Sequence, residues 1–298
     1  MAITKRSDLI VPEILTDAIK AEFTGMTVLN GTNAAVVNPT MPSTRGGDVV
    51  KVPYFGLLGE LDDINDDETT GTADALVPGV PALTPAKLTM TADSAQVHHA
   101  GKAFEVTEWA QMAASYADPY AEAARQVRIA VQRRLDKALI DAARTTDLVT
   151  DVYNATTPVN MSYDLAVDAK YLWGDQSDGD IAMMAIHSNT GKAISKLKDS
   201  MGRPLLVDPK DGAPSRFAGM PLKQSDLLSA TGSPTKYETL LVKPGALIAW
   251  YNGDFQVQTD KDILSDTRIA AVHIYYVVHR YRHLVGNPKT GVVKIVHN

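Results

Sequence analysis

The 298-residue sequence contains no cysteine. Disulfide bonds, zinc–thiolate centres and cysteine nucleophiles are therefore excluded. Basic residues are also in the minority, because 29 Lys and Arg stand against 35 Asp and Glu, which gives a net charge of -6. This balance argues against a protein that grips nucleic acid over a broad basic face, although it leaves local basic patches open.

Long apolar runs are missing as well. No segment approaches the ~20 apolar residues of a membrane span, and the start of the chain, Met1–Asp8, lacks the apolar core of a signal peptide. We therefore expect a soluble protein made in a cytoplasm. Hydrophobic residues make up 45% of the chain and charged residues 21%, which is enough for a substantial core in one large domain or two modest ones.

The longest regular pattern predicts a helix from Asp118 to Arg144. Asp118 is a suitable N-cap and Pro119 fits the first helical position. Apolar residues then recur at steps of three and four, at Tyr120, Ala124, Val127, Val131, Leu135, Ala138 and Ala142. Such a helix is roughly 40 Å long. It is either an ordinary long helix under a sheet or a spine against which separate lobes pack.

Residues 1–105 are predicted to form limbs. Residues 1–46 are an arm with a short amphipathic helix over 11–23. Residues 47–105 are a two-stranded projection, with β-like character at Val49–Phe55 and again at 80–91, and 96–106 is a further candidate strand. Its tip is acidic, because the stretch from Val52 to Ala86 holds no Lys or Arg and seven acids: Glu60, Asp62, Asp63, Asp66, Asp67, Glu68 and Asp74.

The acidic tip has a partial likeness to a calcium loop. Asp63, Asn65 and Asp67 fit positions 1, 3 and 5 of an EF-hand, but Glu68 stands where Gly is needed and Asp74 where a bidentate Glu is needed. No flanking helices are evident. A solvated acidic loop, or one that faces a basic neighbour, explains the tip better.

The rest of the chain alternates between helices and strands. Thr107–Ala117 is predicted to be a short helix with Trp109 and Met112 facing inward. A second helix is expected to be capped by Ser162 and to run to Trp173, with Leu172 on its apolar face. A buried strand, Ile181–Ile186, and a helix over 189–198 capped by Ser188 follow. The last expected strands are 269–284 and 291–296.

Enzyme signatures are weak. No G-x-S-x-G nucleophile elbow is present. Thr190-Gly-Lys-Ala echoes a phosphate loop, but Ile186 replaces the required upstream Gly. His98-His99 and the pair His279 and His283 lack an obvious third ligand, so we interpret them as surface or interface histidines.

Four features of the second half of the chain occur in a fixed order. The first two are the run Leu-Lys-Asp-x-x-Gly-Arg-x-Leu at Leu197–Leu205 and the Gly-x-Pro turn at Gly219–Pro221. They are followed by the strand segment Leu240–Trp250 and by a long terminal β segment from Asp260 to Pro288. Together with the arm, the projection and the spine helix, they resemble the major capsid proteins of tailed bacteriophages, which have the HK97-like fold. The resemblance covers nearly the whole chain.

The resemblance implies an α+β chain in five parts: an N-terminal arm (1–46), an extended β-hairpin loop (47–105), a peripheral domain with the spine helix (106–150), an axial domain (151–238) and return strands of both domains (239–298). It implies a non-enzymatic protein without cofactor or metal, which assembles in the host cytoplasm into the hexamers and pentamers of an icosahedral virion shell around double-stranded DNA. Portal, scaffold and decoration proteins are the other expected partners, and DNA would be held without sequence specificity. The alternatives are an encapsulin-type compartment shell, and a soluble α/β enzyme or ligand-binding domain.

Subunit contacts are predicted between the acidic tip and arginines of a neighbouring copy. The residues concerned are Glu60, Asp62, Asp63, Asp66, Asp67, Arg125, Arg128 and Arg133. Some family members also join subunits through a Lys–Asn isopeptide bond that a Glu promotes. Ala271 and His279 stand at the Asn and Glu positions here, so no such cross-link is expected.

Overall fold

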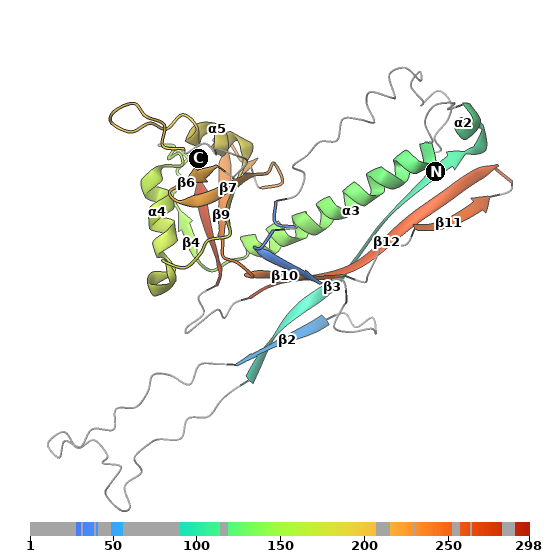
Figure 1. Cartoon of the computed structure of the whole chain (residues 1–298), viewed down its shortest axis with the longest axis horizontal. Coiled ribbons are helices and arrows are strands. Elements are labelled where there is room, and N and C mark those ends of the chain that lie inside the picture. The colour runs from blue at the N-terminus through green and yellow to red at the C-terminus, as the bar shows by residue number, and fades with distance from the viewer. Residues whose placement is uncertain are drawn as a thin grey trace, which may run out of the picture.

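The computed structural model describes residues 28–30, 32–38, 40, 49–55, 90–113, 119–206, 215–228, 230–251, 257–262, 264–281 and 290–298. These residues form two β-sheets and a long helix that lies against one of them and reaches the other (Figure 1). No helix in these ranges is both long and apolar enough to cross a membrane.

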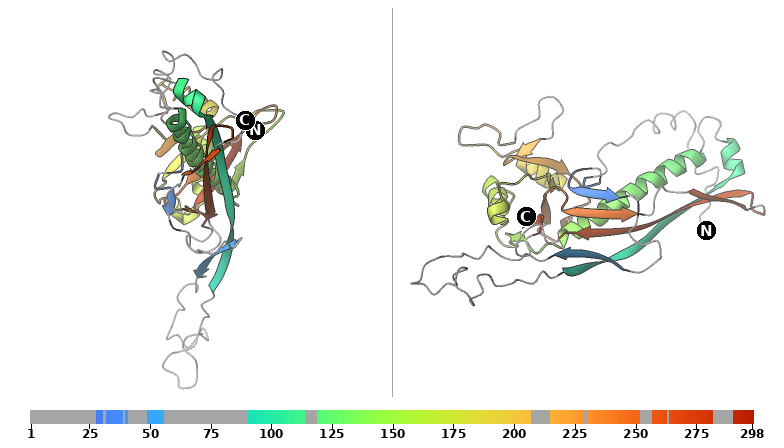
Figure 2. Two further views of the ribbon diagram at one scale, coloured as in Figure 1. Left: turned by 90° about the vertical axis from the view of Figure 1, so that its right-hand side faces the viewer. Right: turned by 60° about the horizontal axis from the view of Figure 1, so that its bottom comes forward.

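The first sheet, here the long sheet, has six strands among the described residues. Its order is β1 (Ala35–Asn38), β10 (Leu247–Tyr251), β12 (Thr267–Arg280), β3 (Met90–Thr107) and β2 (Val49–Phe55), with β11 (Val257–Asp262) also paired to β12. Strands β12 and β3 pair antiparallel from Thr267–Thr107 to Val277–Val97. The short helix α2 (Glu108–Ala113) follows β3 at the far end of this ladder. Figure 2 shows how far the ladder extends away from the lobe that holds the second sheet.

The predicted spine is helix α3 (Pro119–Arg144). Its residues Val127, Val131 and Leu135 form a buried stripe that packs on alternate residues of β12, namely Val272, Ile274 and Tyr276. The four-residue spacing on the helix and the two-residue spacing on the strand each place one face in this contact. The predicted N-cap, Asp118, lies outside the described residues.

The second sheet, here the lobe sheet, has seven strands among the described residues. Its order is β4 (Val149–Asp151), β13 (Val292–His297), β9 (Lys236–Val242), β5 (Met183–Ile186), β7 (Met220–Gln224) and β6 (Arg216–Phe217), with β8 (Ala230–Thr231) paired to β9. Helix α4 (Tyr163–Tyr171), the 3₁₀ turn η2 (Gly174–Gln176) and helix α5 (Ser188–Ile194) complete the lobe. Its core contains fully buried Trp173, Ile186, Ile194 and Phe217.

The two sheets meet at the carboxyl end of α3. Leu139, Ile140 and Ala143 of the helix share one buried cluster with Val242 of β9 and Leu247 of β10. The chain passes from the lobe sheet to the long sheet between these strands, through Gly245, whose φ of +67° favours glycine. A single core therefore fixes the lobe to the spine.

Several local expectations are confirmed. Strand β2 covers Val49–Phe55 and pairs antiparallel with β3, from Val49–Gln96 to Phe55–Met90. Ser162 caps α4 through its hydroxyl, which accepts from the Leu165 N–H at 3.2 Å. Strand β5 is buried throughout.

Other expectations were wrong. Trp109 and Met112 of α2 are 63% and 70% exposed, because Ala110 occupies the inward position of this short helix. Leu172 is also exposed, since α4 ends at Tyr171. Helix α5 begins at Ser188 and is capped by His187, whose Nδ1 accepts from the Asn189 N–H. The cap therefore lies one residue before the predicted one.

Candidate subunit-contact surfaces

The spine helix presents part of its arginine set to solvent. Arg133 is exposed on α3. Arg134 donates through Nε to the Tyr276 hydroxyl at 2.9 Å and lies over that ring. Arg125 makes two hydrogen bonds of 2.8 Å with Glu122, one turn earlier on the helix. The hydrogen bond from Arg125 is the main reason that the pKa of Glu122 is lowered.

The predicted contact residues differ in how much of their charge is open to a neighbouring subunit. Arg133 is available to a neighbour, whereas part of the charge of Arg125 is already balanced by Glu122. The side chain of Arg128 and the acids Glu60, Asp62, Asp63, Asp66 and Asp67 lie outside the described residues. The contact between the acidic tip and the spine arginines therefore stays a prediction.

The structure adds an anchor that the sequence interpretation missed. Asp136 of α3 is completely buried, and its carboxylate accepts three backbone N–H groups. The donors are Val28 to Oδ2 at 3.0 Å, and Leu29 and Asn30 to Oδ1 at 2.7 and 2.9 Å. Val28 and Leu29 are themselves buried in the core where the two sheets meet. One carboxylate thus fixes the point at which the N-terminal part of the chain joins the spine.

A signal for this anchor was present in the sequence. Asp136 precedes Leu139, Ile140 and Ala143 by three, four and seven residues, so it shares their helix face. An acid within such an apolar face needs hydrogen-bond donors when it is buried. The predicted apolar stripe follows Val131 and Leu135. The last two turns of α3 bury a different face, which carries Leu139, Ile140 and Ala143.

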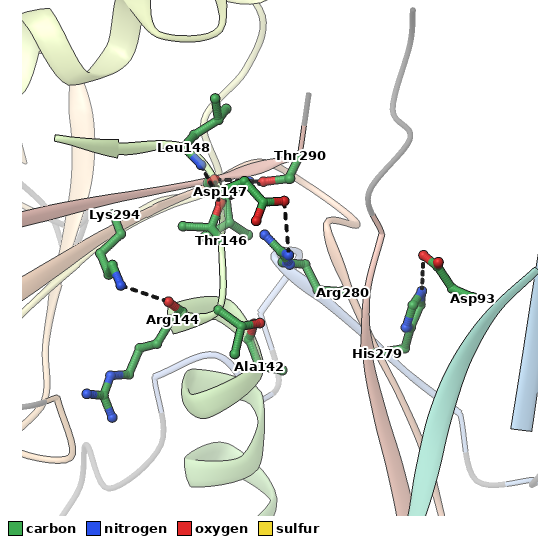
Figure 3. Close-up of polar contacts among 12 residues, drawn as sticks. Asp93, Ala142, Arg144, Thr146, Asp147, Leu148, His279, Arg280, Thr290 and Lys294 are labelled. Atoms are coloured by element: carbon green, nitrogen blue, oxygen red, sulfur yellow. Dashed lines mark hydrogen bonds and ion pairs between the residues drawn. The ribbon is translucent and has the colours of Figure 1, made fainter. Parts of the chain in front are cut away.

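The connection out of the spine is held by a polar network (Figure 3). Lys294 of β13 donates to the Arg144 carbonyl at 3.0 Å, which satisfies a free carbonyl at the helix end and places a cation there. The Arg144 guanidinium pairs with Glu238 of β9. The Thr146 hydroxyl contacts the Thr290 hydroxyl at 2.9 Å. These contacts bind the helix end to two strands of the lobe sheet.

A polar pocket of about 430 Å³ lies where the hairpin base meets this junction. It is lined by the end of α3, by the last residues of β12 and by a short stretch of β3, namely Ala142, Thr145, Val278, His279, Arg280, Asp93, Ser94, Ala95 and Gln96. His279 Nε2 lies 3.8 Å from Asp93 Oδ2, and Arg280 Nη2 lies 3.8 Å from Asp147 Oδ2. Figure 3 shows the two pairs on separate sides of β12.

The pocket does not form a nucleophilic triad. Ser94 follows Asp93 directly on a strand, so the two side chains point to opposite faces, and His279 contacts the Asp side. We interpret the His279–Asp93 pair as a tie between the hairpin base and β12. His279 is buried, so of the two roles expected for it, surface or interface, the surface role was wrong.

The histidines of the predicted pair His98-His99 lie at the surface of the long sheet. His98 and His99 are exposed. His99 Nε2 lies 3.2 Å from His273 Nδ1, and its ring stacks on Tyr275. Within the described ranges no group of three His, Cys, Asp or Glu side chains could hold a metal ion. His283 lies outside those ranges.

No protein-family model and no curated protein matches the chain. Several solved structures do match it in fold. The capsid of a native GTA particle matches with a TM-score of 0.65 over 93% of this chain and 92% of that chain, at 13% sequence identity. The capsid structure of the cyanophage P-SCSP1u matches with a TM-score of 0.63 at 12% identity, covering 92% and 89% of the two chains. A chain from Microbacterium phage Oxtober96 matches with a TM-score of 0.63 at 16% identity, covering 98% of both.

The chain has the HK97-like capsid fold. The fold class expected from the resemblance is therefore confirmed, and the match runs over nearly the full length of each partner. At these identities the likeness concerns the fold and not individual side chains. The long sheet with α3 and the lobe sheet with α4 and α5 are the described parts of this HK97-like chain.

Proposed function

We propose that this protein is a major capsid protein, which self-assembles into the hexamers and pentamers of an icosahedral shell around double-stranded DNA. The observation that carries the proposal is the likeness of the whole chain to capsid chains of a GTA particle and a cyanophage. The role is structural, and the shell belongs to a virion assembled in a host cytoplasm. Portal, scaffold and decoration proteins are the further partners proposed.

The shape supports assembly. A chain whose long sheet extends far beyond its lobe, and whose hairpin base leaves the body (Figure 2), keeps a large surface for its size. Extended limbs of this kind gain burial from neighbouring copies. In this proposal residues 1–46 are the arm, 47–105 the extended loop, 106–150 the peripheral domain, 151–238 the axial domain and 239–298 the return strands.

Electron microscopy of the purified protein tests the function. We expect closed particles with five-fold vertices, and nuclease-resistant double-stranded DNA inside particles purified from infected cells. Closed particles that enclose a protein and no DNA would favour an encapsulin-type compartment instead. A protein that forms no particles, with or without a co-expressed scaffold, would contradict the proposal.

Charge contacts between copies are the second part of the proposal. Exposure of the Arg133 side chain supports this part, because it leaves that guanidinium open to a neighbouring copy. The variant Asp62→Asn, Asp63→Asn, Asp66→Asn, Asp67→Asn should impair assembly more than subunit folding. The matched control removes four exposed acids of the lobe, by Asp168→Asn, Asp175→Asn, Asp178→Asn and Asp180→Asn. Normal yield and thermal stability of particles from the first variant would refute this contact.

A further inference from the structure

Three large apolar side chains are held in solvent at the far end of the long sheet. Trp109 and Met112 of α2 are 63% and 70% exposed, and Leu264 in the turn between β11 and β12 is 99% exposed. Figures 1 and 2 both show α2 and this turn at the same end of the molecule, remote from the lobe. We call these three residues the apolar tip.

Helix α2 exposes its large apolar side chains and buries a small one, whereas folding of a single chain favours burial of the large ones. Trp109 and Met112 are three residues apart and share a helix face, and this face is the exposed one. Ala110 is completely buried on the other face, and Val106, which precedes the helix, is also buried. The helix therefore packs a small residue on its own sheet and presents its largest residue outward.

Hydrogen bonds fix the tip in place. The Thr107 hydroxyl accepts from the Ala110 N–H at 3.1 Å, which caps α2, and the Glu108 N–H donates to the Asp266 carbonyl at 3.1 Å. The Asp262 carboxylate accepts from the Leu264 N–H at 2.9 Å and from the Ser265 hydroxyl at 2.8 Å. The helix and the turn are thus joined directly, and Leu264 is exposed from a hydrogen-bonded turn.

Charges of both signs surround the tip. Lys261 pairs with Glu108 and lies 3.6 Å from Asp266, while Arg268 lies 3.8 Å from Glu108. The acids at the tip, Glu108, Asp262 and Asp266, outnumber these two bases by one. Salt screens so small a net charge between exposed groups, so two tips repel each other only weakly and can exchange these ion pairs. A nucleic acid, by contrast, gains little from a surface whose cations already face carboxylates.

The area of the tip limits what it can do alone. Three side chains at these exposures offer on the order of 400 Å² of apolar surface, about half of the ~800 Å² per partner that a stable complex buries. A contact of this size is weak in an isolated pair and effective when it repeats many times in a closed assembly. A second copy of this chain in a shell satisfies both conditions.

We propose that the apolar tip is a contact between copies of this chain, in which Trp109, Met112 and Leu264 of one subunit pack against the tip of another. The proposal rests on the shell function. It adds a defined apolar anchor at the far end of the long sheet to the charge contacts proposed for the acidic segment.

Tryptophan fluorescence reports on this anchor directly. Trp173 is completely buried and Trp250 is half-buried, so Trp109 is the tryptophan most open to acrylamide in a dissociated subunit. We expect assembly to reduce acrylamide quenching at least threefold and to shift the emission to shorter wavelength. In the variant Trp109→Phe both changes should fall to the small contribution of Trp250 while particles still form, because Phe keeps an apolar contact.

A second variant tests the energetic role. Met112→Ser with Leu264→Ser should keep the circular dichroism spectrum of the subunit and raise the concentration needed for assembly at least tenfold, whereas Leu264→Met should leave it near the wild-type value. Unchanged quenching of Trp109 in intact particles would overturn the proposal. So would a Trp109 already shielded in the dissociated subunit, since this chain's own residues would then cover the tip. If the wild type forms no particles, the shell function fails separately, and quenching that stays constant with protein concentration would then refute the tip contact as well.

Discussion

Removing the Asp136 carboxylate should detach the N-terminal part of the chain from the spine. In Asp136→Ala, the N–H groups of Val28 and Leu29 lose their acceptor inside the core, and the N–H of Asn30 loses it at the margin. An unsatisfied buried donor costs about 1–3 kcal/mol. The chain avoids this cost only by exposing Val28 and Leu29, whose burial contributes about 1.5–3 kcal/mol each. Leaving two N–H groups unsatisfied, or exposing the two side chains, each lowers the free energy of unfolding by about 3 kcal/mol and at most by about 6 kcal/mol.

The isosteric variant separates charge from shape. Asp136→Asn keeps one carbonyl oxygen, which can still accept from Leu29 and Asn30, but it places an amide donor opposite the Val28 N–H. We expect a smaller loss of about 1–3 kcal/mol. The control is Asp141→Asn on the same helix, because Asp141 is half exposed and pairs with Arg144 at 3.4 Å. Its loss should stay below about 0.5 kcal/mol.

Urea denaturation of the dissociated subunit provides the measurement. With a slope of about 1–3 kcal/mol per molar urea, Asp136→Ala should lower the midpoint by about 1 M or more. Limited proteolysis should also cleave the variant near residues 28–34 faster than the wild type. A free energy of unfolding for Asp136→Ala within about 0.5 kcal/mol of the wild-type value would refute the anchoring role.

Two further predictions concern the core of the lobe and the centre of the long sheet. Burial lowers the pKa of His297, partly offset by a hydrogen bond to the Asn298 carbonyl. The unfolded chain therefore binds the proton more readily, and stability should fall as pH drops below the ordinary histidine pKa of about 6.5. His297→Gln should reduce the loss in urea midpoint between pH 7.5 and 5.5, and an equal loss in both proteins would contradict this assignment. Gly101→Ala would place a Cβ 2.8 Å from His273 Nδ1 and 2.9 Å from the Val272 carbonyl oxygen, so it should cost about 1–3 kcal/mol in thermal or urea unfolding. Adding His273→Ala should recover only the side-chain part of that loss, and full recovery would show that the backbone contact is not limiting.

Local patterns predicted the local elements well. The spine, the hairpin base and the Ser162 cap each follow from residues close in sequence, through periodicity, β-branched content or a capping side chain. The insertion of β10 between β1 and β12 does not follow from such patterns, because parallel pairing of Ala35 with Leu247 joins segments 212 residues apart. Order of motifs, rather than any one motif, supplied the correct fold.

The contact surfaces were harder to predict for a physical reason. Trp109 and Met112 were placed inward because large apolar residues usually gain most from burial, a rule that applies to a chain whose burial is complete within itself. Asp136 departs from the corresponding rule that acids stay exposed, because three backbone N–H donors make its burial favourable. In both cases the partner lies far along the chain or, as we propose for the tip, in another copy.

Sedimentation of the purified protein over a wide concentration range tests the central claim most directly. The account predicts slowly sedimenting subunits at low concentration and large closed particles above a threshold, with few intermediates between them. Subunits that remain single at every concentration, including in the presence of a co-expressed scaffold, would contradict the account.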